Sequence, residues 1–276
     1  MSKLTKFISQ RQLIAFFILA YAITWILWGA QIAFAIDIKN SLGSILNALA
    51  IFGPTLAGII LTFVLNGRQG VLDLFARLSP ARAGLRWVGI ALLIPFLIII
   101  AALLIGIGMG SPIPAKLAVS IWLLPLLLEA IRIFFVGGPL GEEIGWRGFA
   151  LPRLLQSHNN AMKASLILGL IWGIWHAPIY AVAGTGQNDI LKSGGSFLVL
   201  FPAFVVWVMG LAVIFTWLYK NSNGNLLIAI LFHTAVNTAA FFPSVIGSQF
   251  GMATLLNAGL TWVVAIIVSR TKAFRE

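Results

Sequence analysis

The feature that most constrains this chain is a series of eight long apolar runs separated by short connections. A helix needs about 20 apolar residues to cross the hydrocarbon of a bilayer. Hydrophobic residues make up 60% of the 276 positions and charged residues only 9%, whereas soluble domains carry about 25% charged residues. The sequence therefore predicts an all-α, polytopic membrane helical bundle that forms a single integral membrane domain over residues 1–276. The runs that predict its eight transmembrane helices are 13–36, 44–65, 87–110, 118–137, 163–183, 196–219, 224–242 and 251–269.

Lysine and arginine residues are distributed unevenly over the connections. Cytoplasmic loops of membrane proteins carry an excess of these residues. With the N-terminus inside, 14 of the 18 Lys and Arg residues fall on the cytoplasmic side. We therefore expect both termini in the cytoplasm, and we attribute the net charge of +11 to orientation and contact with anionic lipids rather than to nucleic acid. The three basic residues of the outer side are Lys39, Lys116 and Lys192.

Two connections have an unusual composition. Residues 66–86 mix leucines with arginines, which fits either an amphipathic segment on the membrane surface or an ordinary basic loop. The Gly-Gly-Pro sequence at 137–139 directly follows the fourth run, and it predicts a bend or break of the helix there. Beyond it the pattern becomes helical again, as far as Pro152 or Gln156.

Ionisable residues inside a membrane are costly, so each one is a candidate for function. Glu142 and Glu143 follow the predicted break, and Arg147 lies one helical turn after Glu143, where the two can form an ion pair. Glu142 then points about 100° away and is free for proton chemistry. His176 lies within the fifth run.

His233 and Asn237 share one face of the seventh run, because they are four residues apart. At about 1.5 Å per residue, His233 and His176 both reach the middle zone of the bilayer. A carboxylate, two imidazoles and an amide on three helices predict a polar site inside the membrane. By contrast, Glu129 and Arg132 are one turn apart in the fourth run and are predicted to neutralise each other.

Several classes of hydrolase are excluded by inspection. The chain has no cysteine, no H-E-x-x-H zinc motif and no G-x-S-x-G nucleophile elbow. A carboxylate with an imidazole can instead deprotonate water, directly or on a metal, and the Asn237 amide can donate to a developing oxyanion. This set of residues fits hydrolysis of a peptide bond without a covalent intermediate.

Three motifs in order resemble those of the CPBP family of intramembrane endopeptidases, which includes CAAX prenyl protease 2 and bacteriocin-processing proteins. G-E-E-I-G-W-R-G-F at 141–149 resembles the E-E-x-x-x-R motif, W-G-I-W-H at 172–176 resembles F-x-x-x-H, and H-T-A-V-N at 233–237 resembles H-x-x-x-N. The similarity covers about residues 118–243. Trp172 stands where the family usually has phenylalanine, an exchange of one aromatic residue for another that we expect to leave activity unaffected.

The resemblance implies a role for each candidate residue. Glu142 would be the general base acting on water with His176, and His233 with Asn237 would hold the oxyanion. Glu143 and Arg147 would support and orient the first motif. A divalent metal such as zinc, held by the glutamate and the two histidines (Glu142, His176 and His233), and a metal-free mechanism are both allowed.

The resemblance also implies the setting of the reaction. It predicts a cavity open to the cytoplasmic side and to lipid, a membrane-tethered or lipidated peptide as substrate, and no nucleic acid partner. The absence of cysteine, the compact length and the lack of a sorting signal favour a prokaryotic plasma membrane; the sequence does not indicate an oligomeric state. Two other classes of protein stay open: a catalytically inactive membrane protein that binds peptides or confers immunity, and a proton-coupled transporter.

Overall fold

The computed structural model describes residues 8–116, 119–245 and 251–275, and every regular element in these ranges is helical. The predicted all-α class is therefore confirmed for the described residues. Lys3 and Lys6, two of the basic residues assigned to the cytoplasmic side, lie outside them. The elements are α2 (Gln12–Ala33), α3 (Ser41–Ile51), α4 (Gly53–Ala76), η1 (Pro80–Arg82), α5 (Leu85–Gly108), α6 (Val119–Val136), α7 (Pro139–Gly145), η2 (Trp146–Ala150), α8 (Leu151–His158), α9 (Ala161–Trp175), η3 (Ala177–Tyr180), α10 (Gly186–Lys192), α11 (Phe197–Asn221), α12 (Leu226–Val245), α13 (Gly251–Ser269) and α14 (Lys272–Arg275).

Several helices in the described part of the chain are long and apolar enough to cross a membrane. Within the described residues there are six, or seven if the bent pair 121–136 and 139–158 counts as one span. Each of the eight predicted runs carries a helix, and the last run contributes the shorter apolar helix Leu255–Ser269 within the described residues. The run 44–65 is divided between α3 and α4 at Phe52. The bundle is nevertheless polytopic, and its exposed side chains include many large apolar ones, as a surface in contact with lipid requires.

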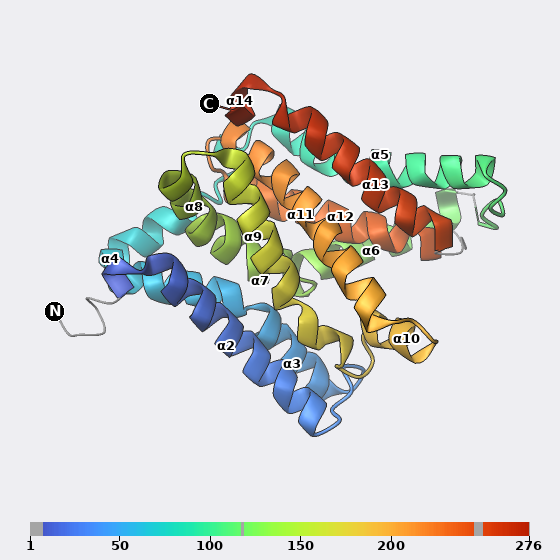
Figure 1. The fold of residues 1–276 in the computed structure, drawn as a ribbon, viewed down its shortest axis with the longest axis horizontal. Helices are drawn as coiled ribbons and strands as arrows, with labels where there is room; N and C mark the ends of the chain where they lie inside the picture. The colour runs from blue at the N-terminus through green and yellow to red at the C-terminus, as the bar shows by residue number, and fades with distance from the viewer. Residues whose placement is uncertain (1–7, 117–118, 246–250, 276) are drawn as a thin grey trace.

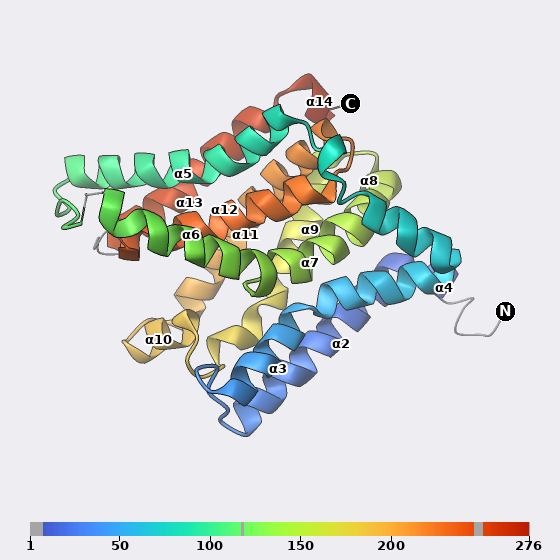
Figure 2. The same ribbon diagram turned by 180° about the vertical axis from the view of Figure 1, so that it is seen from behind.

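The helices form two packed groups, one of α2, α3 and α4 and one that contains α5, α6, α11, α12 and α13 (Figures 1 and 2). Helix α2 packs on α3 and α4, while α12 packs on α5, α6, α7 and α11. Helix α13 packs on α5 and α11, and α9 lies along α11. Close approach requires small residues at the contacts. A Cβ on Gly169 would lie 2.7 Å from Met209 Cα, and one on Gly145 would lie 2.2 Å from Pro54 O. These two glycines therefore allow α9 to pack closely on α11 and α7 to pack closely on α4.

The connection 66–86 is helical in its first part, and its placement at the membrane surface stays a prediction. Gly67 has φ 64° and breaks α4, so the residues from there to Ala76 form a separate helical stretch. Leu74 on this stretch is buried, whereas Leu72 is half exposed. The stretch is thus amphipathic, and an irregular segment with the short helix η1 follows it.

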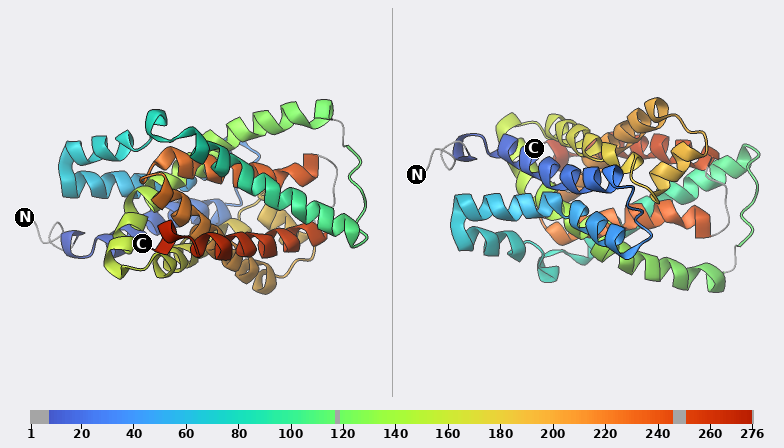
Figure 3. Two further views of the ribbon diagram at one scale, coloured as in Figure 1. Left: turned by 90° about the horizontal axis from the view of Figure 1, so that it is seen from above. Right: turned by 90° about the horizontal axis from the view of Figure 1, so that it is seen from below.

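The connections between helices lie at two opposite ends of the bundle, and hydrogen bonds join neighbouring segments at each end. At one end Arg153 Nε donates to Gln12 Oε1 at 2.6 Å, and Lys220 Nζ donates to Phe274 O at 2.9 Å. At the other end Ile38 N donates to Ala183 O at 3.1 Å. In Figure 3, α2 begins and α14 ends toward the same end. This arrangement agrees with an even number of crossings, and the cytoplasmic placement of that end remains a prediction.

Reporter fusions will check this topology. Fusions in 112–116 and 184–195 are expected to report the outer side, because these connections belong to the end that is poor in Lys and Arg. A fusion after Arg275 is expected to report the cytoplasm. A cytoplasmic signal from either outer connection would contradict the predicted orientation.

Candidate active site

The bend between α6 and α7 places two adjacent glutamates inside the bundle. Helix α6 ends at Val136, Gly138 takes φ 118°, and Pro139 starts α7, with a bend of 41° between the two parts. Proline suits the first turn of a helix because its missing N–H has no intrahelical partner there. The predicted break is thus confirmed, and it directs Glu142 and Glu143 into the core, where they are 4% and 0% exposed.

Glu143 is the centre of a buried charged group. Its Oε1 accepts hydrogen bonds from Arg147 Nη1 at 2.9 Å and from His233 Nδ1 at 2.8 Å. The ion pair with Arg147 lies where the four-residue spacing predicts it. The bond to His233, on α12 and 90 positions away, links the first motif to the third.

Arg147 is completely buried, with its guanidinium between two aromatic rings. Its central carbon lies 4.2 Å from the ring centroid of Trp172 and 3.8 Å from that of Phe215. Arginine is suited to such stacking because its charge is planar and delocalised. Its Nε and Nη2 and the Glu143 Oε2 have no hydrogen-bond partner among the described residues.

Glu142 is held by a different partner. Its Oε2 accepts a hydrogen bond from Trp172 Nε1 at 2.6 Å. The backbone of the same tryptophan orients His176, whose Nδ1 lies 2.8 Å from Trp172 O. A carbonyl oxygen can only accept, so Nδ1 of His176 carries the proton, and its Nε2 is a free acceptor when the ring is neutral.

Asn237 and Glu142 border one small space. A Cβ added to Gly138 would lie 2.7 Å from Glu142 Oε1 and 3.7 Å from Asn237 Nδ2. Asn237 Nδ2 also donates to Gly137 O at 3.1 Å, which leaves its second hydrogen available. The glycine therefore keeps open a position between a carboxylate oxygen and an amide donor.

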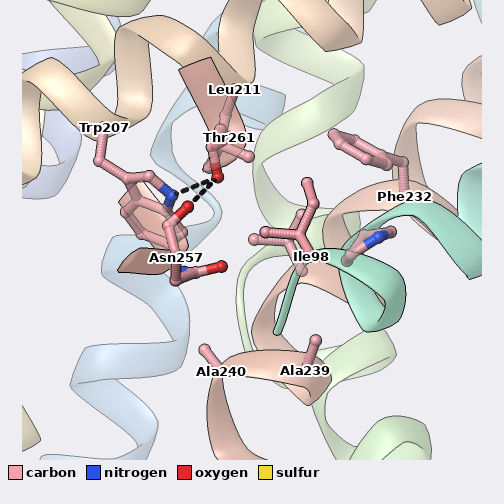
Figure 4. A pocket seen from close by; sticks show the side chains of 10 residues that line it. Ile98, Trp207, Leu211, Phe232, Ala239, Ala240, Asn257 and Thr261 are labelled. Carbon is pink, nitrogen blue, oxygen red and sulfur yellow. Dashed lines mark hydrogen bonds between the residues drawn. The ribbon is translucent and has the colours of Figure 1, made fainter. Parts of the chain in front are cut away.

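All four residues predicted to be catalytic line one cavity of about 320 Å³. Glu142, His176, His233 and Asn237 share its wall with aromatic and aliphatic side chains. A neighbouring pocket of only about 10 Å³ lies behind Trp207, whose Nε1 donates to Thr261 Oγ1 at 3.1 Å (Figure 4). Mostly apolar walls with a few convergent polar groups are typical of a substrate site.

The donor set does not form a ready metal site. Within the described residues, no three side chains of His, Asp or Glu are grouped so that they could hold a metal ion. Two of the three predicted ligands each have one atom in a hydrogen bond, Glu142 through Oε2 and His233 through Nδ1, which leaves Glu142 Oε1 and His233 Nε2 without these partners. Zinc binding by Glu142, His176 and His233 stays a prediction from the sequence.

Sequence reasoning missed two residues that position this site. Trp172 was expected to be equivalent to phenylalanine, but its indole N–H, which phenylalanine lacks, binds Glu142. Arg77 was expected in a surface connection, but it donates to Gly224 O at 3.0 Å and to Gly148 O at 2.9 Å. The second carbonyl belongs to the π-helical turn η2 that carries Arg147. No local signal in 66–86 distinguishes this arginine from its neighbours.

Comparisons with known proteins agree with the resemblance that the motifs carry. Residues 120–239 match the family described as type II CAAX prenyl endopeptidase Rce1-like. The chain is also 24% identical over 231 residues to CAAX prenyl protease 2 of Methanococcus maripaludis, with 80% of this chain and 81% of that protein covered. The matched segment contains all three motifs and every residue predicted to act at the site. This chain, a helical membrane protein, is therefore similar over residues 120–239 to the Rce1-like family of type II CAAX prenyl endopeptidases.

Proposed function

We propose that this protein is an intramembrane endopeptidase that hydrolyses a peptide bond of a membrane-associated, lipidated substrate of the CAAX type. The observation that carries the proposal is the convergence of Glu142, His176, His233 and Asn237 on one cavity inside a membrane bundle. The name of the Methanococcus maripaludis relative, CAAX prenyl protease 2, supports the substrate class.

In this proposal, Glu142 and His176 activate a water molecule. Oε1 of Glu142 borders the open space at Gly138, and it takes a proton from water as the oxygen attacks the scissile carbonyl. His176 Nε2, unprotonated in the neutral ring, accepts the second hydrogen of the water and so orients it. The proton on Glu142 then passes to the leaving amine, which breaks the peptide bond and restores the carboxylate.

The oxyanion that forms during attack is stabilised from α12. Asn237 donates the hydrogen that is not bound to Gly137. His233 donates from Nε2 when it is doubly protonated, and the Glu143 carboxylate at its Nδ1 is the partner that an imidazolium needs. Donors fixed in a water-poor site stabilise a developing charge without reorganisation.

Cleavage of a lipidated peptide tests the function. The purified protein is incubated with a prenylated peptide that ends in a CAAX sequence and with the same peptide lacking the lipid, and products are identified by mass spectrometry. We expect release of the C-terminal residues from the prenylated peptide. Binding of this peptide without cleavage would contradict the proposal and favour the inactive binder, and proton-coupled uptake into vesicles would favour the transporter.

The role of Asn237 predicts a specific kinetic effect. Asn237→Ala is expected to lower kcat about 100-fold or more, because one oxyanion donor is typically worth that much. KM is expected to change little, because the oxyanion forms only after the ground state. Asn257→Ala is the matched control, since this amide lines the small neighbouring pocket (Figure 4). A rise in KM with unchanged kcat for Asn237→Ala would assign this residue to substrate binding instead.

A further inference from the structure

We propose that Trp172 is a positioning residue, whose indole N–H fixes Glu142 so that Oε1 is the oxygen that accepts the proton from water. This inference rests on the proposed function, in which Glu142 is the general base. It concerns a side chain to which the motif resemblance assigned no role beyond its aromatic ring.

The two oxygens of Glu142 have different surroundings. Oε2 is 2.6 Å from Trp172 Nε1 and accepts the one hydrogen that the indole can donate. Oε1 borders the space at Gly138, on the side where Asn237 Nδ2 also lies. The carboxylate is therefore fixed at one oxygen and open at the other, toward the position between the proposed base and an oxyanion donor.

Trp172 is itself held rigidly. It is 2% exposed, and its ring lies against the guanidinium of Arg147 at 4.2 Å. Its ring also meets Phe215 and His233 edge to face, with centroids 5.6 Å and 5.4 Å apart. A donor fixed by packing on several sides loses little entropy when it holds its partner. The ion pair of Arg147 with Glu143 thus supports the orientation of Glu142 through the indole between them.

The backbone of Trp172 orients His176, which acts on water together with Glu142 in the proposed function. Its carbonyl oxygen accepts from His176 Nδ1 at 2.8 Å, which leaves His176 Nε2 unprotonated in the neutral ring. One residue therefore aims the carboxylate with its side chain and sets the tautomer of the imidazole with its backbone. Substitution of the Trp172 side chain therefore removes the bond to Glu142 and keeps the backbone bond to His176.

The test removes the N–H and keeps an aromatic ring. Trp172→Phe is expected to lower kcat about 10- to 100-fold, which corresponds to about 1.4–2.7 kcal/mol of barrier, within the range for hydrogen bonds to charged groups. KM for the prenylated CAAX peptide is expected to change by less than about threefold, because the lost contact acts on the base rather than on the bound substrate.

Trp146→Phe is the matched control. Trp146 is also fully buried, its Nε1 has no hydrogen-bond partner in the described part of the chain, and it is not among the residues that line the cavity. The same exchange therefore removes ring area there without removing a bond to a carboxylate. Should Trp172→Phe fail to fold, benzothienylalanine at position 172 replaces the N–H by sulfur with nearly unchanged size, and the same drop in kcat is expected.

Glu142→Gln, assayed in parallel, separates failure of this inference from failure of the proposed function. Suppose that Glu142→Gln is inactive while kcat of the Trp172 variants falls no further than that of Trp146→Phe. The positioning role of Trp172 is then overturned, and Glu142 is still assigned as the general base. A rise in KM at unchanged kcat would also overturn it, because Trp172 would then act on the substrate. If Glu142→Gln cleaves normally, the base assignment fails and this inference fails with it.

Discussion

Replacing Glu142 by glutamine is expected to abolish peptide cleavage while the protein stays folded. Removal of a general base typically costs about 100- to 10,000-fold in rate, or about 3–5 kcal/mol of barrier. Glutamine has the same shape, and its carbonyl oxygen still accepts the hydrogen bond that Trp172 Nε1 donates. It cannot take a proton from water as a carboxylate does. The thermal unfolding temperature in detergent is therefore expected to stay close to that of the wild type.

The adjacent carboxylate is the comparison that makes this result decisive. Glu143→Gln, assayed in the same detergent, removes a charge from Arg147 and His233 rather than from the open space at Gly138. We expect it to lower the unfolding temperature as well as activity. If Glu142→Gln keeps near-wild-type cleavage and Glu143→Gln is stably folded but inactive, the base has been assigned to the wrong carboxylate. If both variants keep activity, the first motif is structural.

The features that the sequence predicts well are those with a local physical cause. Apolar runs of bilayer length predict helices, and the Gly-Gly-Pro sequence at 137–139 predicts the bend at which α7 begins. The four-residue spacing of Glu143 and Arg147 predicts an ion pair because it places both on one helix face. Glu129 and Arg132 likewise form the predicted pair, with Arg132 Nε donating to Glu129 Oε2 at 2.8 Å.

Contacts between distant segments are not predictable in this way. Nothing near His233 in the sequence indicates that its Nδ1 meets Glu143 rather than the cavity. The four bonds of Arg77 depend on how the turn after α4 meets residues 147–148 and 219–224, which is decided by packing. The ordered motifs identify which side chains gather at the site, but only the tertiary structure shows which atom of each is free to react.

Replacing Glu143 by alanine is expected to destabilise the fold more than either Glu142→Gln or Glu143→Gln. Removing one partner of a buried ion pair typically costs about 3–5 kcal/mol, because the remaining charge is left without compensation. Arg147 is fully buried, and its Nε and Nη2 already lack partners in the described part of the chain, so Glu143 Oε1 is its only charged acceptor there. His233 would lose the partner of its Nδ1 in the same step, and cleavage is expected to fall together with stability.

Asp189→Ala is the control for this loss. Asp189 lies 3.9 Å from Lys39 in an exposed pair at the opposite end of the bundle, and such pairs are worth about 0–1 kcal/mol. Arg147→Lys is expected to be intermediate, because lysine keeps the charge opposite Glu143 but lacks the planar group that fits between Trp172 and Phe215. Thermal unfolding in detergent measures all three variants. Equal unfolding temperatures for Glu143→Ala and Asp189→Ala would mean that the buried pair is not what holds the first motif in place, and the support role of Glu143 and Arg147 would then have to be abandoned.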